Sequence, residues 1–351
     1  MNRNLIQGSA GGVKMGRGIN MSSPGADQVI AVHEEAVLRD LGNNVNLFIR
    51  IARIMGLTWM KGMGEIDDLH ASRIKANMSK KKPRPIPVPA QFIPQLIDAH
   101  THLASCGGDT AELLKRAHEA GVEKLCTVGD GLAEAELALQ AAQEFNNVYA
   151  ACAIHPTKAD QLDAAARQRL SEMAQDPACV AIGETGLDTY WITHDPENTA
   201  SLEVQEEALR WHIDLAVNSG KALMIHNREA DADLMRVLGS APRPENTILH
   251  CFSSPLGVAK EALERGYILS FAGNVTFKRN EELREAARIA PLEQIFIETD
   301  APYMTPEPFR GSRNEPSLIG HTALCIAEVR GMAVEELAVA LSANFDRVYH
   351  S

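Results

Sequence analysis

The stretch LIDAHTHLASCGG, Leu96–Gly108, decides between the two folds that the rest of the chain allows. It is a short apolar run that ends in two histidines, His100 and His102, shortly before two glycines. A doubly wound open sheet that binds a dinucleotide needs a glycine-rich phosphate loop after its first strand. The residues after this run lack that motif, so we predict a closed barrel and keep the open sheet as the alternative.

Apolar runs alternate with amphipathic segments from this stretch to the end of the chain. Several amphipathic segments stop at a glycine, as helices tend to do, for example at Gly121 and Gly220. Eight strand–helix units in the 256 residues after Gln95 match a (β/α)8 TIM-type barrel, an α/β fold with a usual size of about 250 residues. Continuously apolar strands suit a parallel sheet that is buried on both faces. The eight runs are QLIDAH, KLCTVGD, VYAACAIHP, CVAIGET, ALMIHNR, NTILHCF, YILSFAG and QIFIETD.

The first 95 residues have a different composition. Residues 7–26 are rich in Gly and Ser with little to bury, which predicts disorder. Val45–Met60 has roughly helical apolar spacing and suits either a short helix on the body or a helix on a membrane surface. Ser79–Pro94 is basic and then proline-rich, as in a stiff extended linker. We therefore expect a flexible, largely disordered N-terminal extension and linker over residues 1–95 and the barrel over residues 96–351.

Charge divides along the same boundary. Residues 1–95 hold 13 Lys+Arg and 7 Asp+Glu, whereas the remainder holds 21 and 39, in a chain of net charge −12. An acidic body argues against broad electrostatic binding of duplex nucleic acid, although carboxylates that hold cations contribute to such a balance. The six cysteines form no C-x-x-C pair, which indicates reduced thiols. With no apolar stretch long enough for a bilayer and no secretory signal, we expect a cytoplasmic protein without membrane contact or an obligate protein partner.

The predicted strands end in side chains that bind metal ions. In a TIM-type barrel the carboxyl ends of all strands face one bowl, and residues two apart in extended backbone face the same way, so both histidines of H-T-H can reach one ion. Each such residue could instead be a hydrogen-bonded loop residue, but a chance coincidence of six would be very rare. Four histidines and two carboxylates are a typical ligand set for two divalent ions. The predicted ligands are His100, His102, Glu184, His226, His250 and Asp300.

Seven motifs, in one order along the barrel, carry a resemblance to a known family. They are DAHTHL, AIHP, IGETGLD, MIHNREA, LHCFSS, IETDAPYMTP and RGSRNEP. With these motifs the chain resembles, from about Leu96 to its end, the TatD family of metal-dependent deoxyribonucleases within the amidohydrolase-like barrels. The resemblance covers the whole barrel and implies a hydrolase with two divalent metal ions, which would be Mg²⁺, Zn²⁺ or Mn²⁺.

The resemblance also implies a role for each predicted ligand. One ion would be held by His100, His102 and Asp300, the second by His226 and His250, and Glu184 would bridge them. Two cations about 3.5–4 Å apart acidify a shared water and clamp the attacking and leaving oxygens of a phosphodiester. Asp300 would orient the hydroxide and accept its proton, so Asp300 and Glu184 are the expected catalytic residues. Asp98 is a candidate for fixing the imidazoles, with a solvated strand end as the alternative.

Three departures from the family's pattern bear on substrate preference. Ala104 follows H-T-H-L where the family often has an acid, and Thr189 separates Asp188 from Tyr190 where the family often reads G-L-D-Y. The 95-residue extension belongs to no part of the motif set. None of these departures removes a predicted ligand, so the expected catalysis stands.

Three further residues are expected to bind substrate. Arg228 and Arg313 carry guanidinium groups that match phosphate oxygens, with a surface salt bridge as the alternative for each. His155 would donate to the same phosphate or cap the following helix. Tyr190 and Trp191 follow the fourth strand and would either stack on a base or pack the loop.

Three functions fit these residues. The first is a TatD-type 3′–5′ exodeoxyribonuclease that acts on single-stranded DNA ends, with the polarity taken from the resemblance. The second uses the same metals on an ester or amide, as a deacylase acting on aminoacyl-tRNA or as a small-molecule amidohydrolase, because the ligands alone do not separate these bonds. The third is a binding protein on a degenerate barrel, which would lack ligands, and none of the six is missing. We favour the first.

Overall fold

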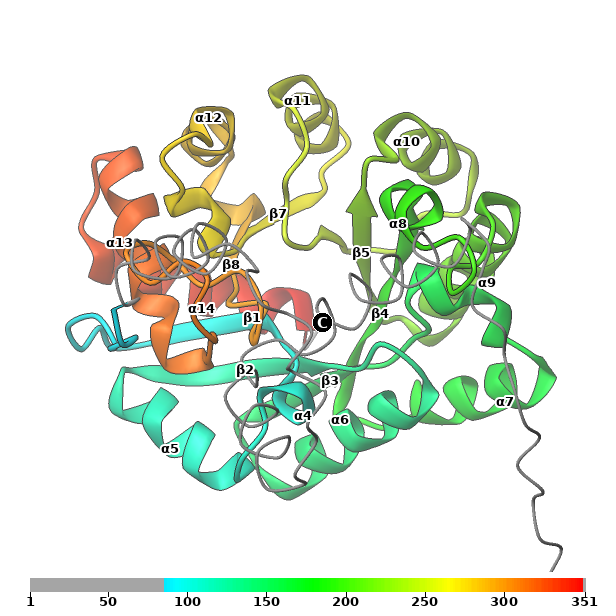
Figure 1. Ribbon diagram of the computed structural model, residues 1–351, viewed down its shortest axis with the longest axis horizontal. Coiled ribbons are helices and arrows are strands. Elements are labelled where there is room, and N and C mark those ends of the chain that lie inside the picture. Colours follow the sequence, from blue (N-terminus) through cyan, green and yellow to red (C-terminus); the bar gives the residue numbers. More distant parts are fainter. Residues whose placement is uncertain (1–84, 350–351) are drawn as a thin grey trace, which may run out of the picture. The chain divides into compact units, whose positions relative to one another are not determined.

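The computed structural model describes residues 85–349, and in this part of the chain eight parallel strands form one sheet in sequence order (Figure 1). Each strand pairs with the next one along the chain, as in a TIM-type barrel. The predicted barrel is therefore confirmed, and the open doubly wound alternative is wrong. The strands are β1 (Leu96–Thr101), β2 (Val122–Val128), β3 (Val148–Ala151), β4 (Cys179–Asp188), β5 (Ala222–Arg228), β6 (Thr247–Leu249), β7 (Ile268–Phe271) and β8 (Ile295–Ile297).

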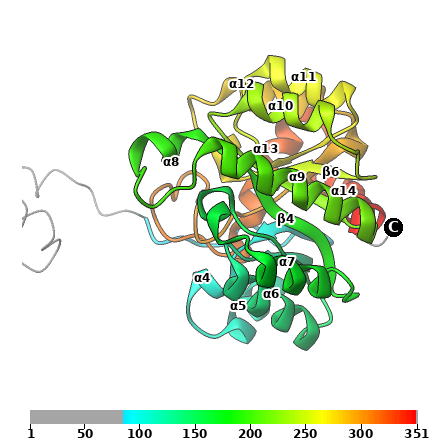
Figure 2. The same cartoon turned by 90° about the vertical axis from the view of Figure 1, so that its right-hand side faces the viewer.

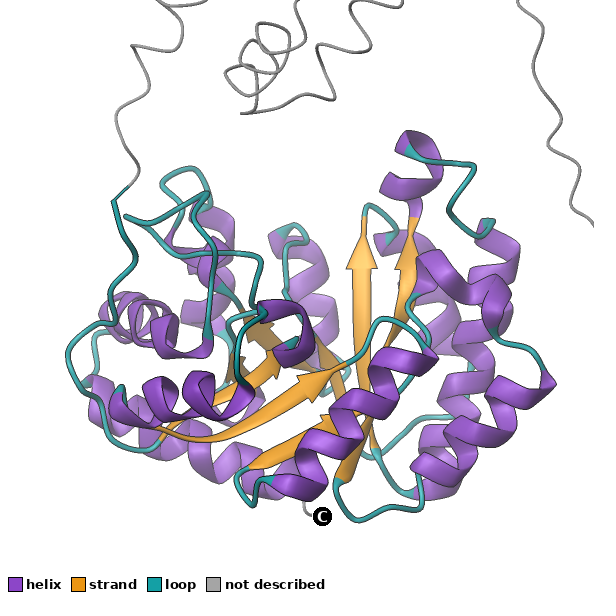
Figure 3. Ribbon diagram, turned by 60° about the horizontal axis from the view of Figure 1, so that its bottom comes forward, coloured by secondary structure: helices purple, strands orange, loops and turns teal. Residues whose placement is uncertain are grey.

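Helices surround the strands on the outside (Figure 3). They are α4 (Leu103–Cys106), α5 (Thr110–Glu119), α6 (Leu132–Glu144), α7 (Ala164–Met173), α8 (Thr189–His194), α9 (Leu202–Ser219), α10 (Asp231–Ser240), α11 (Leu256–Glu264), α12 (Glu281–Ile289), α13 (Ile319–Arg330) and α14 (Val334–Tyr349). Short 3-10 turns are η3 (Pro156–Gln161), η4 (Gly273–Thr276), η5 (Leu292–Gln294) and η6 (Pro316–Leu318). No helix within residues 85–349 combines the length and the hydropathy that a membrane span requires.

Local sequence accounts for where these helices begin and end. The side chain of Asp109 accepts the N–H of Ala111 at the start of α5, and Asp163 caps α7 in the same way. At the other end, α9 stops at Gly220, which takes the left-handed conformation with φ of 68°. The glycine stops that the sequence predicts are thus real helix ends.

The barrel closes between its last and first strands through the residues that follow β8. The N–H of Asp300 donates to the carbonyl of His100 at 2.9 Å, and the N–H of His102 donates to the carbonyl of Ala301 at 2.8 Å. Asp98, fully buried in β1, accepts from the Thr299 N–H at 2.8 Å and from its hydroxyl at 2.5 Å. Closure therefore brings Asp300, which follows β8, beside His100 of β1 and His102 just after it.

Asp98 has a different partner from the one that the sequence suggested. Its carboxylate accepts the backbone N–H of His100 at 3.3 Å, in addition to its two bonds with Thr299. Burial raises the pKa of Asp98 to about 8. Asp98 therefore fixes the backbone that carries a predicted ligand, which is neither the contact with an imidazole ring nor the solvated strand end that the sequence left open.

The core fills the barrel and the layer between its strands and helices. All ten residues of β4 and all six residues of β1 are buried, as a parallel sheet covered on both faces requires. The largest side chains of the core include Phe271, Phe296 and Phe345. Burial on this scale makes the barrel a rigid support for the strand ends.

The N-terminal predictions fall mostly outside the described residues. Residues 1–84, which include the glycine-rich start and Val45–Met60, are not described. Within the expected linker, Ile93 is fully buried, and the His321 ring donates to the carbonyl of Val88 at 2.9 Å. Packing on the barrel thus begins a few residues before the expected boundary at residue 95, and the division of the chain into two parts stays a prediction.

Candidate metal centre

The structure brings the six predicted ligands together at the carboxyl ends of the strands. They lie on β1, β4 and β5 or in the segments that follow β1, β6 and β8. Five of them line one cavity of about 810 Å³, and the sixth, His100, is fully buried beside them. The bowl that the sequence predicts is therefore present, and the predicted ligands fall into two groups that share one carboxylate.

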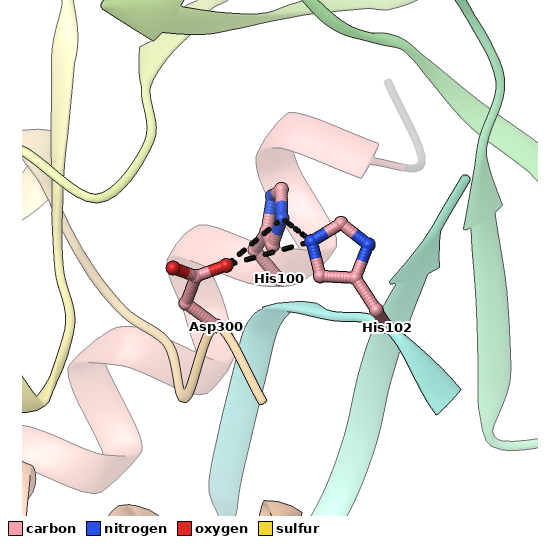
Figure 4. Close-up of side chains that lie close together, drawn as sticks. All are labelled: His100, His102 and Asp300. Carbon is pink, nitrogen blue, oxygen red and sulfur yellow. Dashed lines mark hydrogen bonds and ion pairs between the residues drawn. The ribbon is translucent and has the colours of Figure 1, made fainter. Parts of the chain in front are cut away.

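The first group consists of His100, His102 and Asp300 (Figure 4). The Nε2 atoms of the two histidines lie 3.1 Å apart. Asp300 Oδ1 lies 3.6 Å from His100 Nε2 and 3.5 Å from His102 Nε2. Three ligand atoms thus surround one small volume, in a geometry that suits one cation.

The second group consists of Glu184, His226 and His250. Glu184 Oε2 lies 2.6 Å from His250 Nε2 and 3.3 Å from His226 Nδ1. Its other oxygen, Oε1, lies 3.6 Å from His102 Nε2 and 4.0 Å from His100 Nε2. One carboxylate therefore faces both groups, with a different oxygen toward each.

Two glycines explain why Glu184 reaches this place. A Cβ on Gly183 would lie 2.4 Å from the Met224 Cβ, and a Cβ on Gly186 would lie 1.9 Å from the His226 carbonyl oxygen. Both glycines lie on β4 and face its neighbour β5, so at these two positions the strands approach more closely than a side chain would permit. The G-E-T-G sequence is therefore the local reason for the position of the central carboxylate.

Each imidazole is held from behind through the nitrogen that faces away from the centre. His102 Nδ1–H donates to the carbonyl of Val128 at 3.2 Å, and Asp130 Oδ1 lies 3.3 Å from the same atom. His226 Nε2–H donates to Asp188 Oδ2 at 2.9 Å. These bonds keep a proton on the outer nitrogen, so the inner nitrogen is the atom that would bind a cation once its own proton is lost.

His250 and His100 follow the same scheme. His250 Nδ1–H donates to Glu298 Oε1 at 3.3 Å, and His100 Nδ1 lies 3.1 Å from the Met224 sulfur. The contacts of Asp188, Glu298 and Asp130 with these rings were not predicted from the sequence. The first two stand within IGETGLD and IETDAPYMTP, so acids inside the motifs were the available signal.

The charges of the centre balance one another. Burial would lower the pKa of His102, but its hydrogen bond to Asp300 and the charges of Glu184 and Asp130 raise this pKa to about 9. Burial would likewise raise the pKa of Glu184, but the charge of His250 and the contacts with His226 hold it well below its usual range. Glu184 is thus ionised, and the His102 ring carries an extra proton. Because this proton occupies a nitrogen that a cation would bind, protons and cations compete for the same atoms.

The ligand atoms fit divalent cations by their chemistry. Glu184 Oε2 is buried, and its contact with His250 Nε2 lacks the alignment of a hydrogen bond. The Nδ1 proton of His250 serves Glu298. Burial would lower the pKa of His250, but the charges of Glu184 and Glu298 raise it well above its usual value, so a second proton on Nε2 faces Glu184 Oε2 unless a cation takes its place. Imidazole nitrogens and carboxylate oxygens are the ligands that Zn²⁺ and related ions take.

The backbone is strained at two of the positions that form this centre. Asp300 has φ of 52° and Cys251, next to His250, has φ of 43°, both in the left-handed region. The N–H of Cys251 donates to Glu298 Oε1 at 2.6 Å, which holds this conformation. Strain of this kind persists only where the surroundings impose it, and such residues cluster at functional sites.

Of the three predicted substrate-binding residues, His155 and Arg228 line the cavity. His155 Nδ1 accepts the N–H of Thr157 at 3.2 Å and so caps η3, one of the two roles that the sequence left open. Its ring packs edge-on against His226 with the centroids 4.4 Å apart, and burial lowers its pKa to about 3. A neutral His155 whose Nδ1 accepts has its proton on Nε2, which makes that atom a donor.

Arg313 lies elsewhere. Its guanidinium donates to the carbonyl of Ser105 at 2.5 Å and covers Gly107, 3.3 Å from the place that a Cβ would take. It lines a separate groove with Pro87 and Glu315. The structure therefore does not bring Arg313 to the cavity, and a phosphate-binding role for it stays a prediction.

Comparison with known proteins agrees with this architecture. A family model described as TatD related DNase matches residues 97–350. A protein of Mycobacterium tuberculosis described as an uncharacterized metal-dependent hydrolase TatD is 45% identical over 258 residues, which cover 72% of this chain and 97% of that protein. A protein of Shigella flexneri named 3′-5′ ssDNA/RNA exonuclease TatD is 31% identical over 248 residues, which cover 69% of this chain and 93% of that protein.

A solved structure gives the same result for the fold. The TatD homolog YJJV of Escherichia coli matches with a TM-score of 0.68 and 27% identity, over 73% of this chain and 98% of that chain. Each of these proteins is matched over nearly its whole length.

Proposed function

This chain belongs to the TatD related DNase family, and on that premise we propose that it is a 3′–5′ exodeoxyribonuclease that acts on single-stranded DNA. Family membership makes it a metal-dependent hydrolase. The bond that it cleaves, the polymer and the polarity are the proposal. They are supported by the name of the Shigella flexneri relative and by a cavity that joins metal ligands to groups that can bind phosphate.

One observation carries this proposal, namely the position of Glu184 between the two groups of ligands. Its Oε1 atom faces His100 and His102, and its Oε2 atom faces His226 and His250. In the proposed assignment Glu184 would bridge two divalent cations. Two such cations, when bound, acidify a water and stabilise the charge on the phosphodiester oxygens.

The remaining residues would bind, orient and move protons. Asp300, at the edge of the first group, would accept the proton of the attacking water. His155 Nε2–H and the Arg228 guanidinium, which both line the cavity, would donate to the phosphate oxygens. Asp188 and Glu298 would keep His226 and His250 in the tautomer that binds a cation.

The test follows the two ends of one DNA strand. Purified full-length protein is stripped with a chelator, reloaded with Mg²⁺, Mn²⁺ or Zn²⁺, and given single-stranded DNA labelled at its 3′ or its 5′ end. We expect early release of a labelled mononucleotide from the 3′-labelled strand, a ladder of shortening products from the 5′-labelled strand, and neither without metal.

Two controls separate the alternatives. The same preparation is given aminoacyl-tRNA and an uncharged ester. Hydrolysis of an ester with no cleavage of DNA would replace the nuclease by a deacylase, and early loss of a 5′ label would reverse the polarity.

A further inference from the structure

Helix α8 contributes nothing to the barrel core, yet it is firmly anchored. None of its six residues is buried. Asp188 Oδ1 accepts the N–H of Trp191 at 2.8 Å, and the Thr189 hydroxyl donates to the carbonyl of Glu229 at 2.6 Å. Figure 2 shows α8 at the same end of the barrel as α4, the end at which the strands carry the metal centre. Because burial does not explain this helix, its role depends on the side chains that it presents.

Both faces of the Tyr190 ring are already occupied. The His194 imidazole stacks on it with the centroids 3.9 Å apart and the planes at 16°. The Arg228 guanidinium carbon lies 3.7 Å from the same centroid. Two planar groups this close to one ring cannot share a face, so they cover opposite faces. Tyr190 is therefore no platform for a base, and it holds Arg228 in place.

Trp191 is in the opposite situation. Its side chain lines the cavity, and 39% of the residue is exposed. Tyr190 meets it only edge-on, at 83° and 5.2 Å, and Arg228 lies 5.5 Å from its centroid. Within residues 85–349 no ring stacks parallel on Trp191. A large, partly exposed apolar ring thus borders the cavity of the predicted ligands.

The residue that anchors the Trp191 backbone, Asp188, also contacts a predicted metal ligand. One oxygen of Asp188 accepts from the Trp191 backbone and the other accepts from His226 Nε2. Asp188 is fully buried, and its own N–H donates to the Gln205 side chain at 2.7 Å. A single fixed carboxylate therefore sets the position of Trp191 relative to a predicted ligand of the second cation. A group preorganised in this way gains affinity because little of its freedom is lost on binding.

We propose that Trp191 is the base-stacking residue of this site and that a nucleobase beside the scissile phosphate lies against its indole. The proposal deepens the proposed nuclease function and rests on it. The phosphate would take the cations and Arg228, and the attached base would take the indole. Bases have flat π faces, so stacking tolerates any sequence. Bases within a duplex are already stacked and paired, so such a platform selects unpaired ends.

The test removes the base from the substrate and the indole from the protein. Metal-loaded full-length protein is given single-stranded DNA that is intact or carries an abasic site as the last or the last-but-one nucleotide. Stacking of one base on an aromatic side chain corresponds to about 5- to 150-fold in kcat/KM. We expect Trp191→Leu to lose about 5- to 150-fold in kcat/KM on intact DNA. The variant should then cleave intact DNA and one of the two abasic strands at equal rates. Trp191→Phe, which keeps a ring, restores most of the difference.

A matched control comes from another tryptophan on the barrel. Trp211 also has an arginine at 5.5 Å, Arg167, but it lies outside the residues that line the cavity. Trp211→Leu therefore removes the same kind of ring–arginine contact, and we expect it to leave the preference for intact DNA unchanged.

The outcomes separate the inference from the function on which it rests. An equal loss by Trp191→Leu on intact and both abasic strands, or no loss at all, would overturn the stacking role. If the wild-type protein cleaves no DNA, the nuclease proposal fails, and the stacking role is then decided by the affinity of the metal-loaded protein for intact and abasic tetranucleotides. A wild-type preference for the intact strand that Trp191→Leu abolishes supports it, and equal affinities overturn it.

Discussion

Asp188→Asn is expected to weaken metal binding through the proton on His226, with little effect on the fold. Asp188 has two partners, since Oδ2 accepts from His226 Nε2 at 2.9 Å and Oδ1 accepts from the Trp191 N–H at 2.8 Å. Asparagine offers only one oxygen. If this oxygen keeps the cap on α8, the amide donates to His226 Nε2 and drives the proton to Nδ1. That atom lies 3.3 Å from Glu184 Oε2 and would have to bind the cation.

The magnitude follows from the nature of the contact. Partners that orient a ligating histidine are worth about 10- to 100-fold in metal affinity, which is about 1.4–2.7 kcal/mol. If the amide turned the other way, the cap on the Trp191 N–H would be lost at a cost of about 0.5–2 kcal/mol. A protonated Nδ1 cannot bind metal, so we expect the first orientation to weaken the second site toward the upper end of this range.

The assay is calorimetric titration of chelator-stripped protein with Mn²⁺ or Zn²⁺, with thermal unfolding measured alongside. Asp163→Asn is the control, because Asp163 caps α7 through the N–H of Ala166 at 2.8 Å and belongs to neither group of ligands. We expect it to leave metal affinity unchanged. If Asp188→Asn binds both ions as tightly as the Asp163→Asn control does, the tautomer argument is refuted.

Three further predictions test other parts of the structure. Glu184→Ala should lose most bound metal and nearly all hydrolysis, because its carboxylate faces both groups of ligands; metal analysis showing two retained ions would remove the bridging role. Gly186→Ala should destabilise the barrel by about 3 kcal/mol or more in urea unfolding, because its Cβ would lie 1.9 Å from the His226 carbonyl oxygen, and a loss below about 1 kcal/mol would contradict the packing argument. Burial lowers the pKa of His212 to about 4 from 6.5, so the unfolded chain binds more protons between these pH values. As the pH drops from 6.5 to 4, the free energy of unfolding of the wild-type protein should therefore fall by about 3 kcal/mol more than that of His212→Gln, both measured by urea unfolding. Parallel pH profiles for the two proteins would contradict this prediction.

The sequence was sufficient for the fold and for the convergence of six side chains, for a simple physical reason. Parallel strands buried on both faces are continuously apolar, so their ends are marked by the first polar residues. In a barrel those ends share one face, and the convergence of His100, His226 and Asp300 therefore needs no knowledge of packing. Their roles as ligands remain our proposal.

The residues that hydrogen-bond to the imidazoles could not be predicted from the sequence, because these contacts depend on the register between neighbouring strands. Asp188 reaches His226 since β4 and β5 pair Gly186 with His226 and Asp188 with Arg228, which no periodicity in either strand specifies. Glu298 reaches His250 across β7, with its other oxygen on the Ser270 hydroxyl at 2.5 Å. An acid inside a motif is visible in the sequence, but the ring that it contacts is not.

Loops and short helices were the other part that sequence reasoning did not resolve. Helix α8 buries no residue, so it has no apolar face that a pattern could reveal, and its order comes from hydrogen bonds to Asp188 and Glu229. The guanidinium of Arg313, within the motif RGSRNEP, suggested a phosphate contact. The loop instead turns its guanidinium to the carbonyl of Ser105, and Arg313 is not among the residues that line the cavity.

The central claim is that two cations share Glu184, and anomalous diffraction from crystals of the chelator-stripped protein soaked in Mn²⁺ tests it most directly. We predict two peaks, one among His100, His102 and Asp300 and one beside His226 and His250, each in contact with a different oxygen of Glu184. A single peak, or two peaks of which only one contacts Glu184, would contradict the account.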